Sequence, residues 1–170
     1  MNISAETSTA LDLLVGKFFD LNRSFDRAVS VLENKWAMPN AADIIHHKLA
    51  HLFPLMADIV SGFKDKWNVM TVYLETHEDN RDYDNLNSMM ETLFNEVLDT
   101  CEIIKMVYKV AESHSDFNAM AMLVDLMNKM TDIIAQVNTL KDKAEQMPND
   151  YDVYDNHISA WGIVGLDLGE

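Results

Sequence analysis

Apolar residues recur at three- and four-residue steps along most of the chain, which is the spacing of one face of an α-helix. Four amphipathic segments show this pattern, at about residues 8–36, 40–67, 84–112 and 117–147. Pro39 separates the first two segments and Pro148 follows the last, and Asn40 is a suitable N-cap for the second. Pro54 lies inside the second segment and removes a backbone hydrogen bond, so we expect a kink there.

The connections between the segments predict how the helices are arranged. The first and third links are short, so each flanking pair should form an antiparallel hairpin. The middle link, residues 68–83, is polar. Extended, it would reach roughly 50 Å, which exceeds the length of a helix of about 27 residues. The sequence therefore predicts an all-α, ferritin-like four-helix bundle of two antiparallel hairpins joined by a crossover, with an up-down-up-down bundle as the alternative.

Composition supports long helices and limits the partners. Gly and Pro are scarce before residue 148, which disfavours all-β and α/β folds. We expect the bundle to occupy residues 1–148 and an acidic, aromatic tail to occupy residues 149–170. The net charge of −15 argues against nucleic acid and anionic membranes as partners. The single Cys101, in apolar surroundings, and the absence of a long apolar run or a signal-like N-terminus predict a cytoplasmic protein.

The spacing of histidines and carboxylates indicates whether the bundle could hold a metal site in its interior. Di-iron carboxylate bundles place a Glu-x-x-His pair on each of two helices. Here His46 has Asp43 three residues earlier, and the other five histidines have no acid at that position. The last two segments contain no such pair. We therefore do not expect an intrachain di-iron site in the bundle.

A different pattern lies on the second segment, on the face opposite its apolar residues. With His47 as reference and about 100° per residue, His51 falls near 40°, Asp58 near 20° and Asp65 near 0°. Imidazole and carboxylate groups are suitable ligands for iron or zinc. One straight helix cannot close a site over this length, but two copies related by a two-fold axis could bring the histidines of one to the aspartates of the other. The alternative is a solvated outer face.

The stretch from Lys35 to Lys48 resembles the turn between the first two helices of the Dps proteins, the small ferritin-like proteins of starved bacterial cells. In that family a His-Trp pair is followed by a second His about twelve residues after the first. Trp36 matches the tryptophan and His47 matches the second histidine, and the likeness in segment spacing covers roughly residues 8–145. The resemblance implies a homo-oligomer with an iron-oxidising site between two-fold-related chains.

The sequence departs from the Dps pattern at three of its four ligand positions. Lys35 replaces the first histidine, and Gly62 and Lys66 stand where an Asp and a Glu would fall. Two interpretations remain open. Either the site is displaced by about one turn, or the metal is lost and Lys35 forms a salt bridge with Asp58 or Asp65 of a neighbouring chain.

The functional hypothesis is therefore a Dps-related homo-oligomer that binds or stores iron or acts in oxidative stress, with an altered or lost intersubunit metal site. Ferroxidase activity would require the displaced site to be real. The predicted metal ligands are His47, His51, Asp58 and Asp65, with His46 and Asp43 as secondary candidates. The alternative hypothesis is a metal-free helical oligomerisation or interaction module.

Overall fold

The computed structural model describes residues 3–168, and every regular element in that range is helical. The elements are α1 (Ala5–Asn34), α2 (Pro39–Ile45), the π-helical turn η1 (His46–Ala50), α3 (Leu52–Lys66), α4 (Leu86–Ser113), α5 (Phe117–Gln146), α6 (Tyr151–His157) and the 3₁₀ turn η2 (Ile158–Ala160). None of the described helices combines the length and apolar character needed to cross a bilayer.

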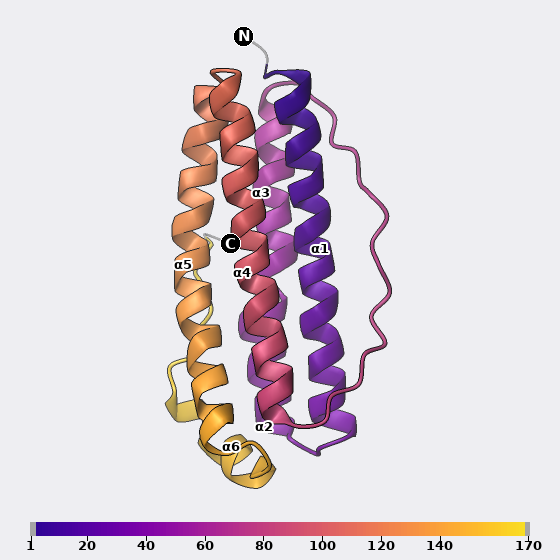
Figure 1. Ribbon diagram of the computed structural model, residues 1–170, viewed down its shortest axis with the longest axis vertical. Coiled ribbons are helices and arrows are strands. Elements are labelled where there is room, and N and C mark those ends of the chain that lie inside the picture. Colours follow the sequence, from indigo (N-terminus) through magenta and orange to yellow (C-terminus); the bar gives the residue numbers. More distant parts are fainter. Residues whose placement is uncertain (1–2, 169–170) are drawn as a thin grey trace.

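The four long helical rods form two antiparallel hairpins, α1 with α2–η1–α3 and α4 with α5 (Figure 1). Helix α1 also packs on α4, and α3 packs on α5. The link between the hairpins runs along the outside of α1 for the length of the bundle (Figure 1). The predicted all-α bundle with a crossover is therefore confirmed, and the up-down-up-down alternative is wrong.

Apolar stripes on all four rods meet in one core. The largest fully buried side chains include Phe18 and Phe25 of α1, Phe53 of α3, and Tyr154 of α6. Phe25 and Phe53 pack with ring centroids 4.8 Å apart. Leucine, valine, isoleucine and methionine side chains of α4 and α5 complete the interior. Burial of these stripes is the main source of stability for such helices.

Polar contacts hold the crossover against α1. The N–H of Val72 donates to Asp12 Oδ1 at 3.1 Å, and the N–H of His77 donates to Asp20 Oδ1 at 3.1 Å. Nearer the end of α1, Arg27 Nε donates to the carbonyl oxygen of Arg81 at 2.7 Å. These bonds satisfy backbone groups of an extended segment that has no strand partner among the described residues.

The start of α2 differs from the prediction that Asn40 would cap it. The helix begins at Pro39, which suits the first helical position because its missing N–H needs no partner there. The cap comes from α6 instead: the N–H of Ala41 donates to Asp155 Oδ1 at 2.7 Å, and Asn40 Nδ2 donates to Asp155 Oδ2 at 3.2 Å. The tail segment is thus docked on the bundle.

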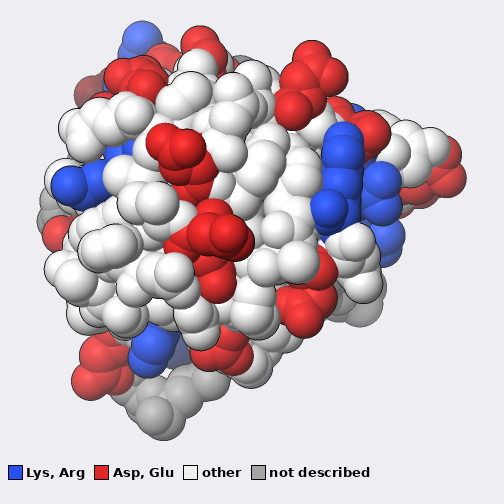
Figure 2. Space-filling model, turned by 90° about the horizontal axis from the view of Figure 1, so that it is seen from below, with Lys and Arg blue, Asp and Glu red and all other residues white. Residues whose placement is uncertain are grey.

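Figure 2 shows the surface at the end of the bundle where α2 and α6 lie, with acidic groups scattered over it.

Candidate metal centre

Helix α2 continues into α3 through η1, and this π-helical turn brings three histidines together. Pro54 has no N–H to donate to the carbonyl of Ala50, and that carbonyl accepts from Asn22 Nδ2 of α1 at 2.9 Å instead. The N–H of His51 donates to the carbonyl oxygen of His46 at 3.3 Å, a five-residue span. The distortion expected at Pro54 therefore takes the form of a π turn, a feature that often occurs at functional sites.

The imidazole rings of His46, His47 and His51 form a compact cluster. Ring centroids of His46 lie 4.8 Å from His47 and 4.3 Å from His51, and the remaining pair is 5.3 Å apart. One ligand nitrogen from each ring can be chosen so that all lie within 4.8 Å of one another. Two nitrogens bound to one ion at about 2.1 Å are at most about 4.2 Å apart. The three nitrogens are therefore near the spacing that one ion requires, and the rings would have to move closer together to share it.

Two carboxylates flank the histidine cluster. Asp26 Oδ1 of α1 lies 3.4 Å from His46 Nδ1, and Asp43 Oδ1 of α2 lies 3.4 Å from His47 Nε2. Within the described part of the chain His46 Nδ1 is buried without a hydrogen-bond partner, so its contact with Asp26 is a close approach and not a formed hydrogen bond. A carboxylate beside an imidazole can orient the ring and leave its other nitrogen for a metal. A groove of about 590 Å³ between α1 and α2 is lined by both carboxylates, Glu33 and the two rings. Its acidic lining favours cations.

The four primary predicted ligands separate into two groups. His47 and His51 lie in the cluster, joined by the secondary candidates His46 and Asp43. Asp58 and Asp65 are exposed on α3, about 10 Å and 21 Å farther along the helix axis than His51. They are outside the cluster within one chain. Their approach from a second copy stays a prediction.

The uniform rotation of 100° per residue assumed for the stripe is wrong across η1. In a regular α-helix His46 and His51 would be about 140° apart around the axis. The π turn inserts one residue, so His46 and His51 lie on one face. Pro54, four residues after Ala50, was the available signal, because the carbonyl that it leaves unpaired marks where a π turn can form.

The bundle interior does not fit a di-iron centre. Among the described residues the buried carboxylates are Asp12 and Asp155. Asp12 forms an ion pair with the buried Lys64, and Asp155 caps α2. Both carboxylates are therefore engaged in other contacts and do not form a shared metal site inside the bundle.

The Dps-like positions outside the cluster have other surroundings. Lys35 Nζ lies 2.7 Å from Asp82 Oδ1 in the same chain and donates to the carbonyl oxygen of Tyr83 at 2.8 Å. This pairing lowers the pKa of the Asp82 carboxyl. Trp36 stacks on Tyr151 of the tail, with ring centroids 5.0 Å apart. Lys35 is therefore already engaged within its own chain.

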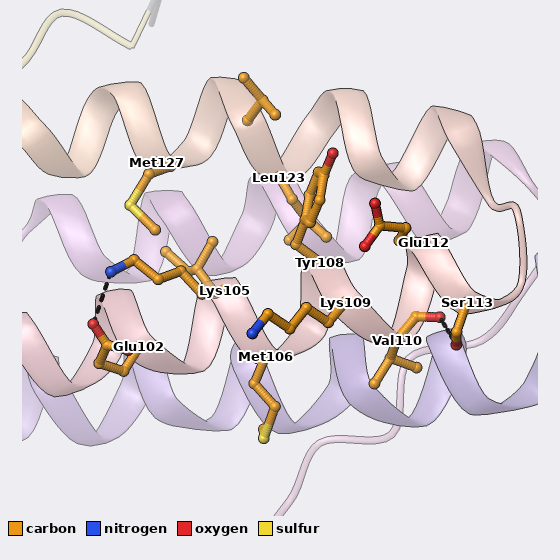
Figure 3. A pocket seen from close by; sticks show the side chains of 12 residues that line it. Glu102, Lys105, Met106, Tyr108, Lys109, Val110, Glu112, Ser113, Leu123 and Met127 are labelled. Atoms are coloured by element: carbon orange, nitrogen blue, oxygen red, sulfur yellow. Dashed lines mark hydrogen bonds and ion pairs between the residues drawn. The ribbon is translucent and has the colours of Figure 1, made fainter.

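A second concave region lies between α4 and α5 (Figure 3). It has a volume of about 710 Å³, and its lining includes the buried Ile104 and Leu123. The side chain of Tyr108 lies within it. An ion pair between Glu102 and Lys105, 2.8 Å long, lies at its edge. The pocket is mainly apolar, so the histidine cluster is the better candidate for metal chemistry.

Comparison with known proteins supports the fold. The chain is similar to an open-pore ferritin from the hyperthermophilic archaeon Archaeoglobus fulgidus, with a TM-score of 0.86 and 11% identity over 94% of this chain and 98% of that one. A second structure of that ferritin gives a TM-score of 0.85 at 12% identity, covering 92% and 96% of the two chains. A humanized archaeal ferritin gives 0.85 at 11%, covering 93% and 96%.

Neither a protein-family model nor a curated protein matches the sequence. The structural likeness establishes the ferritin four-helix-bundle fold.

Proposed function

We propose that this chain is the subunit of a ferritin-like, Dps-related assembly that binds a divalent transition-metal ion, with iron(II) as its cargo. The observation that carries the proposal is the convergence of the His46, His47 and His51 imidazoles, whose ligand nitrogens lie within 4.8 Å. Imidazoles suit iron and zinc, whereas magnesium and calcium prefer oxygen ligands. The structures that share the fold are named ferritins, which supports iron as the cargo.

The flanking carboxylates support this assignment. Metal-binding imidazoles commonly pair their second nitrogen with a carboxylate. Asp26 and Asp43 occupy that position toward His46 and His47. In this arrangement His46 would bind through Nε2 and His47 through Nδ1. The two aspartates would hold the rings in place and offset the charge of the ion.

A second copy of the chain would complete the site. Three imidazoles leave coordination positions open on an iron or zinc ion. Asp58 and Asp65 are exposed on the same helical rod, so a two-fold-related copy of α3 can present them to the cluster. This is the displaced intersubunit site that the resemblance to the Dps family suggests.

Metal titration tests the proposal. The chelator-treated protein is titrated with Zn²⁺ in air and with Fe²⁺ under anaerobic conditions, and calorimetry measures the stoichiometry. We expect one ion per cluster in the wild type, loss of that binding in a His46→Ala, His51→Ala variant, and no heat from Mg²⁺. His157→Ala is the matched control, since His157 is exposed outside the cluster and its Nδ1 faces the carbonyl of Val153.

The contrary results are equally concrete. Unchanged binding in the double variant would remove the cluster as the site, and no binding in the wild type would remove the proposed function. Light scattering addresses the assembly: a monomer at micromolar concentration would exclude the contribution of Asp58 and Asp65 from a second copy.

A metal-free oligomerisation module is the second candidate function. The observation that favours it is the ion pair between Lys35 and Asp82. Lys35 stands where the Dps pattern has a metal-binding histidine, and its charged side chain is already paired within the chain. In that case the chain would assemble without binding Zn²⁺ or Fe²⁺. The same titration and light-scattering measurements separate the two functions.

A further inference from the structure

The C-terminal strap, residues 163–168, lies against the backbone of the π turn that carries the histidines. At Gly165 a Cβ atom would be 2.4 Å from the carbonyl oxygen of Lys48, closer than side chains approach. Gly165 also has φ of +70°, a conformation that favours glycine. Lys48 lies in η1, and in the chain it stands between His47 and His51, the residue that follows the turn. The strap therefore touches the backbone of the candidate metal site itself.

One side chain of α5 holds the strap at this place. Gln136 Oε1 accepts from the N–H of Val164 at 2.9 Å and from that of Gly165 at 2.8 Å. Gln136 Nε2 donates to the carbonyl oxygen of Gly165 at 2.9 Å. Three hydrogen bonds from a single glutamine define the position of Gly165 against Lys48.

The C-terminal tail also contacts the N-terminal end of α2, the helix that precedes η1. Asp155 of α6 accepts from the N–H of Ala41 in the first turn of that helix. The C-terminal region thus contacts the helix before the histidines through Asp155, and the turn that contains them through Gly165. Asp155 and Gly165 of the tail therefore contact the chain on both sides of His46 and His47.

The position of the η1 backbone decides whether the cluster exists. His46 and His51 share a face because η1 is π-helical. If the turn became a regular α-helix, the two residues would be about 140° apart and could not share an ion. A π turn is rare because it is less favourable than a regular α-helix. Contacts from neighbouring segments that fix the η1 backbone therefore help to keep His46 and His51 on one face.

We propose that the C-terminal strap is the positioning element of the metal site, with Gly165 and Gln136 as its positioning residues. This inference rests on the proposed metal-binding function. The strap fixes the Lys48 carbonyl, the carbonyl fixes the turn, and the turn presents the three imidazoles to one ion. Neither positioning residue touches the metal.

Two glycine variants test the inference. Gly165→Ala adds a methyl group that collides with the Lys48 carbonyl, whereas Gly162→Ala adds one at φ of +72° with nothing within 4 Å. Both substitutions strain the backbone in the same way, but only the first disturbs η1. Co²⁺ is the probe, because its visible absorption spectrum reports the number and geometry of its ligands. We expect Gly165→Ala to weaken Co²⁺ affinity by about tenfold or more and alter the spectrum, and Gly162→Ala to change neither.

A third variant covers the case in which Gly165→Ala does not fold. Gln136→Ala removes the three bonds to the strap without adding bulk and should also weaken Co²⁺ binding and change the spectrum. If the wild type binds Co²⁺ and all folded variants bind it equally with the same spectrum, the positioning role is wrong while the metal site stands. If the wild type binds no Co²⁺, Zn²⁺ or Fe²⁺, the proposed function fails and this inference falls with it.

Discussion

The two hairpins of the bundle are built differently. In the second hairpin, α4 and α5 run without interruption for 28 and 30 residues, and their buried face is apolar except for Thr100. The first hairpin contains a π turn, a proline within its second rod and a buried ion pair between Asp12 and Lys64. The candidate metal site lies in this irregular hairpin. On the proposed function, α4 and α5 serve stability, whereas α1 to α3 combine stability with metal binding.

The buried ion pair should give the largest effect. Asp12→Ala would leave the fully buried ammonium group of Lys64 without its carboxylate and the N–H of Val72 without its acceptor. Removing one partner of a buried pair costs about 3–5 kcal/mol. We expect that loss in the free energy of unfolding, measured by urea denaturation.

A double variant sharpens this prediction. Asp12→Leu with Lys64→Met replaces both charges by apolar groups, which is often neutral or stabilising. It should recover most of the stability that Asp12→Ala loses. If the single and double variants were equally unstable, packing rather than the unpaired charge would explain the loss.

A cavity in the second hairpin should have the next largest effect. Leu126 is buried on α5, and truncation of such a leucine to alanine costs about 2–5 kcal/mol. Leu126→Ala should therefore lower the urea midpoint while the folded protein keeps its Zn²⁺ affinity. A parallel loss of Zn²⁺ affinity in the folded variant would contradict the division of roles between the hairpins.

Asn22 should have a smaller effect on stability and a specific one on metal binding. Asn22→Ala removes the donor to the carbonyl of Ala50 that Pro54 leaves unpaired. An unsatisfied buried carbonyl costs about 1–3 kcal/mol, and the loosened turn should also weaken Zn²⁺ binding. Asn34→Ala is the control, because Asn34 is on the same helix and its exposed amide bonds only locally, to the carbonyl of Ser30 and the Ser30 hydroxyl. Equal Zn²⁺ affinity in the two variants would contradict a role for Asn22 in holding the π turn.

Local signals explain why the sequence predicts the second hairpin closely. The predicted segments 84–112 and 117–147 compare with observed helices Leu86–Ser113 and Phe117–Gln146. A capping box of Asn85 and Ser88 begins the first of these helices, and Pro148 follows the second. The crossover was predictable too, because the length of the link limits what it can span. Periodicity and capping are local properties, so they can be read from one sequence.

The histidine cluster could be predicted only in part, because its geometry depends on contacts between distant residues. His47 and His51 follow from helical spacing, but including His46 requires the π turn. The turn in turn involves Asn22 on another helix. The strap contact through Gly165 joins positions more than a hundred residues apart in the chain. No periodicity or local motif encodes such a pair.

The junction between the hairpins provides the smallest predicted effect, a pH dependence. Asp116, at the turn between α4 and α5, accepts from the Ser4 hydroxyl at 2.8 Å and from the Thr7 hydroxyl of α1. Partial burial alone would raise the pKa of the Asp116 carboxyl, but the bonds from Thr7 and Ser4 outweigh it and lower the pKa below its usual value. A carboxyl with a lowered folded-state pKa stabilises the protein above its unfolded pKa of about 3.9. That contribution is lost as the pH falls from there through the folded-state pKa.

Asp116→Asn should therefore flatten the acid limb of the stability curve. Urea unfolding between pH 5 and about pH 3 should show a smaller decrease in the free energy of unfolding for the variant than for the wild type. Asp79 and Asp82 also have lowered pKa values and shape the same limb in both proteins, so the difference between the two curves isolates Asp116. Asp125→Asn makes the same charge change at an exposed position on α5 and should leave the curve closer to that of the wild type. If the two variants shifted the curve equally, net charge rather than the junction between the hairpins would account for the pH dependence.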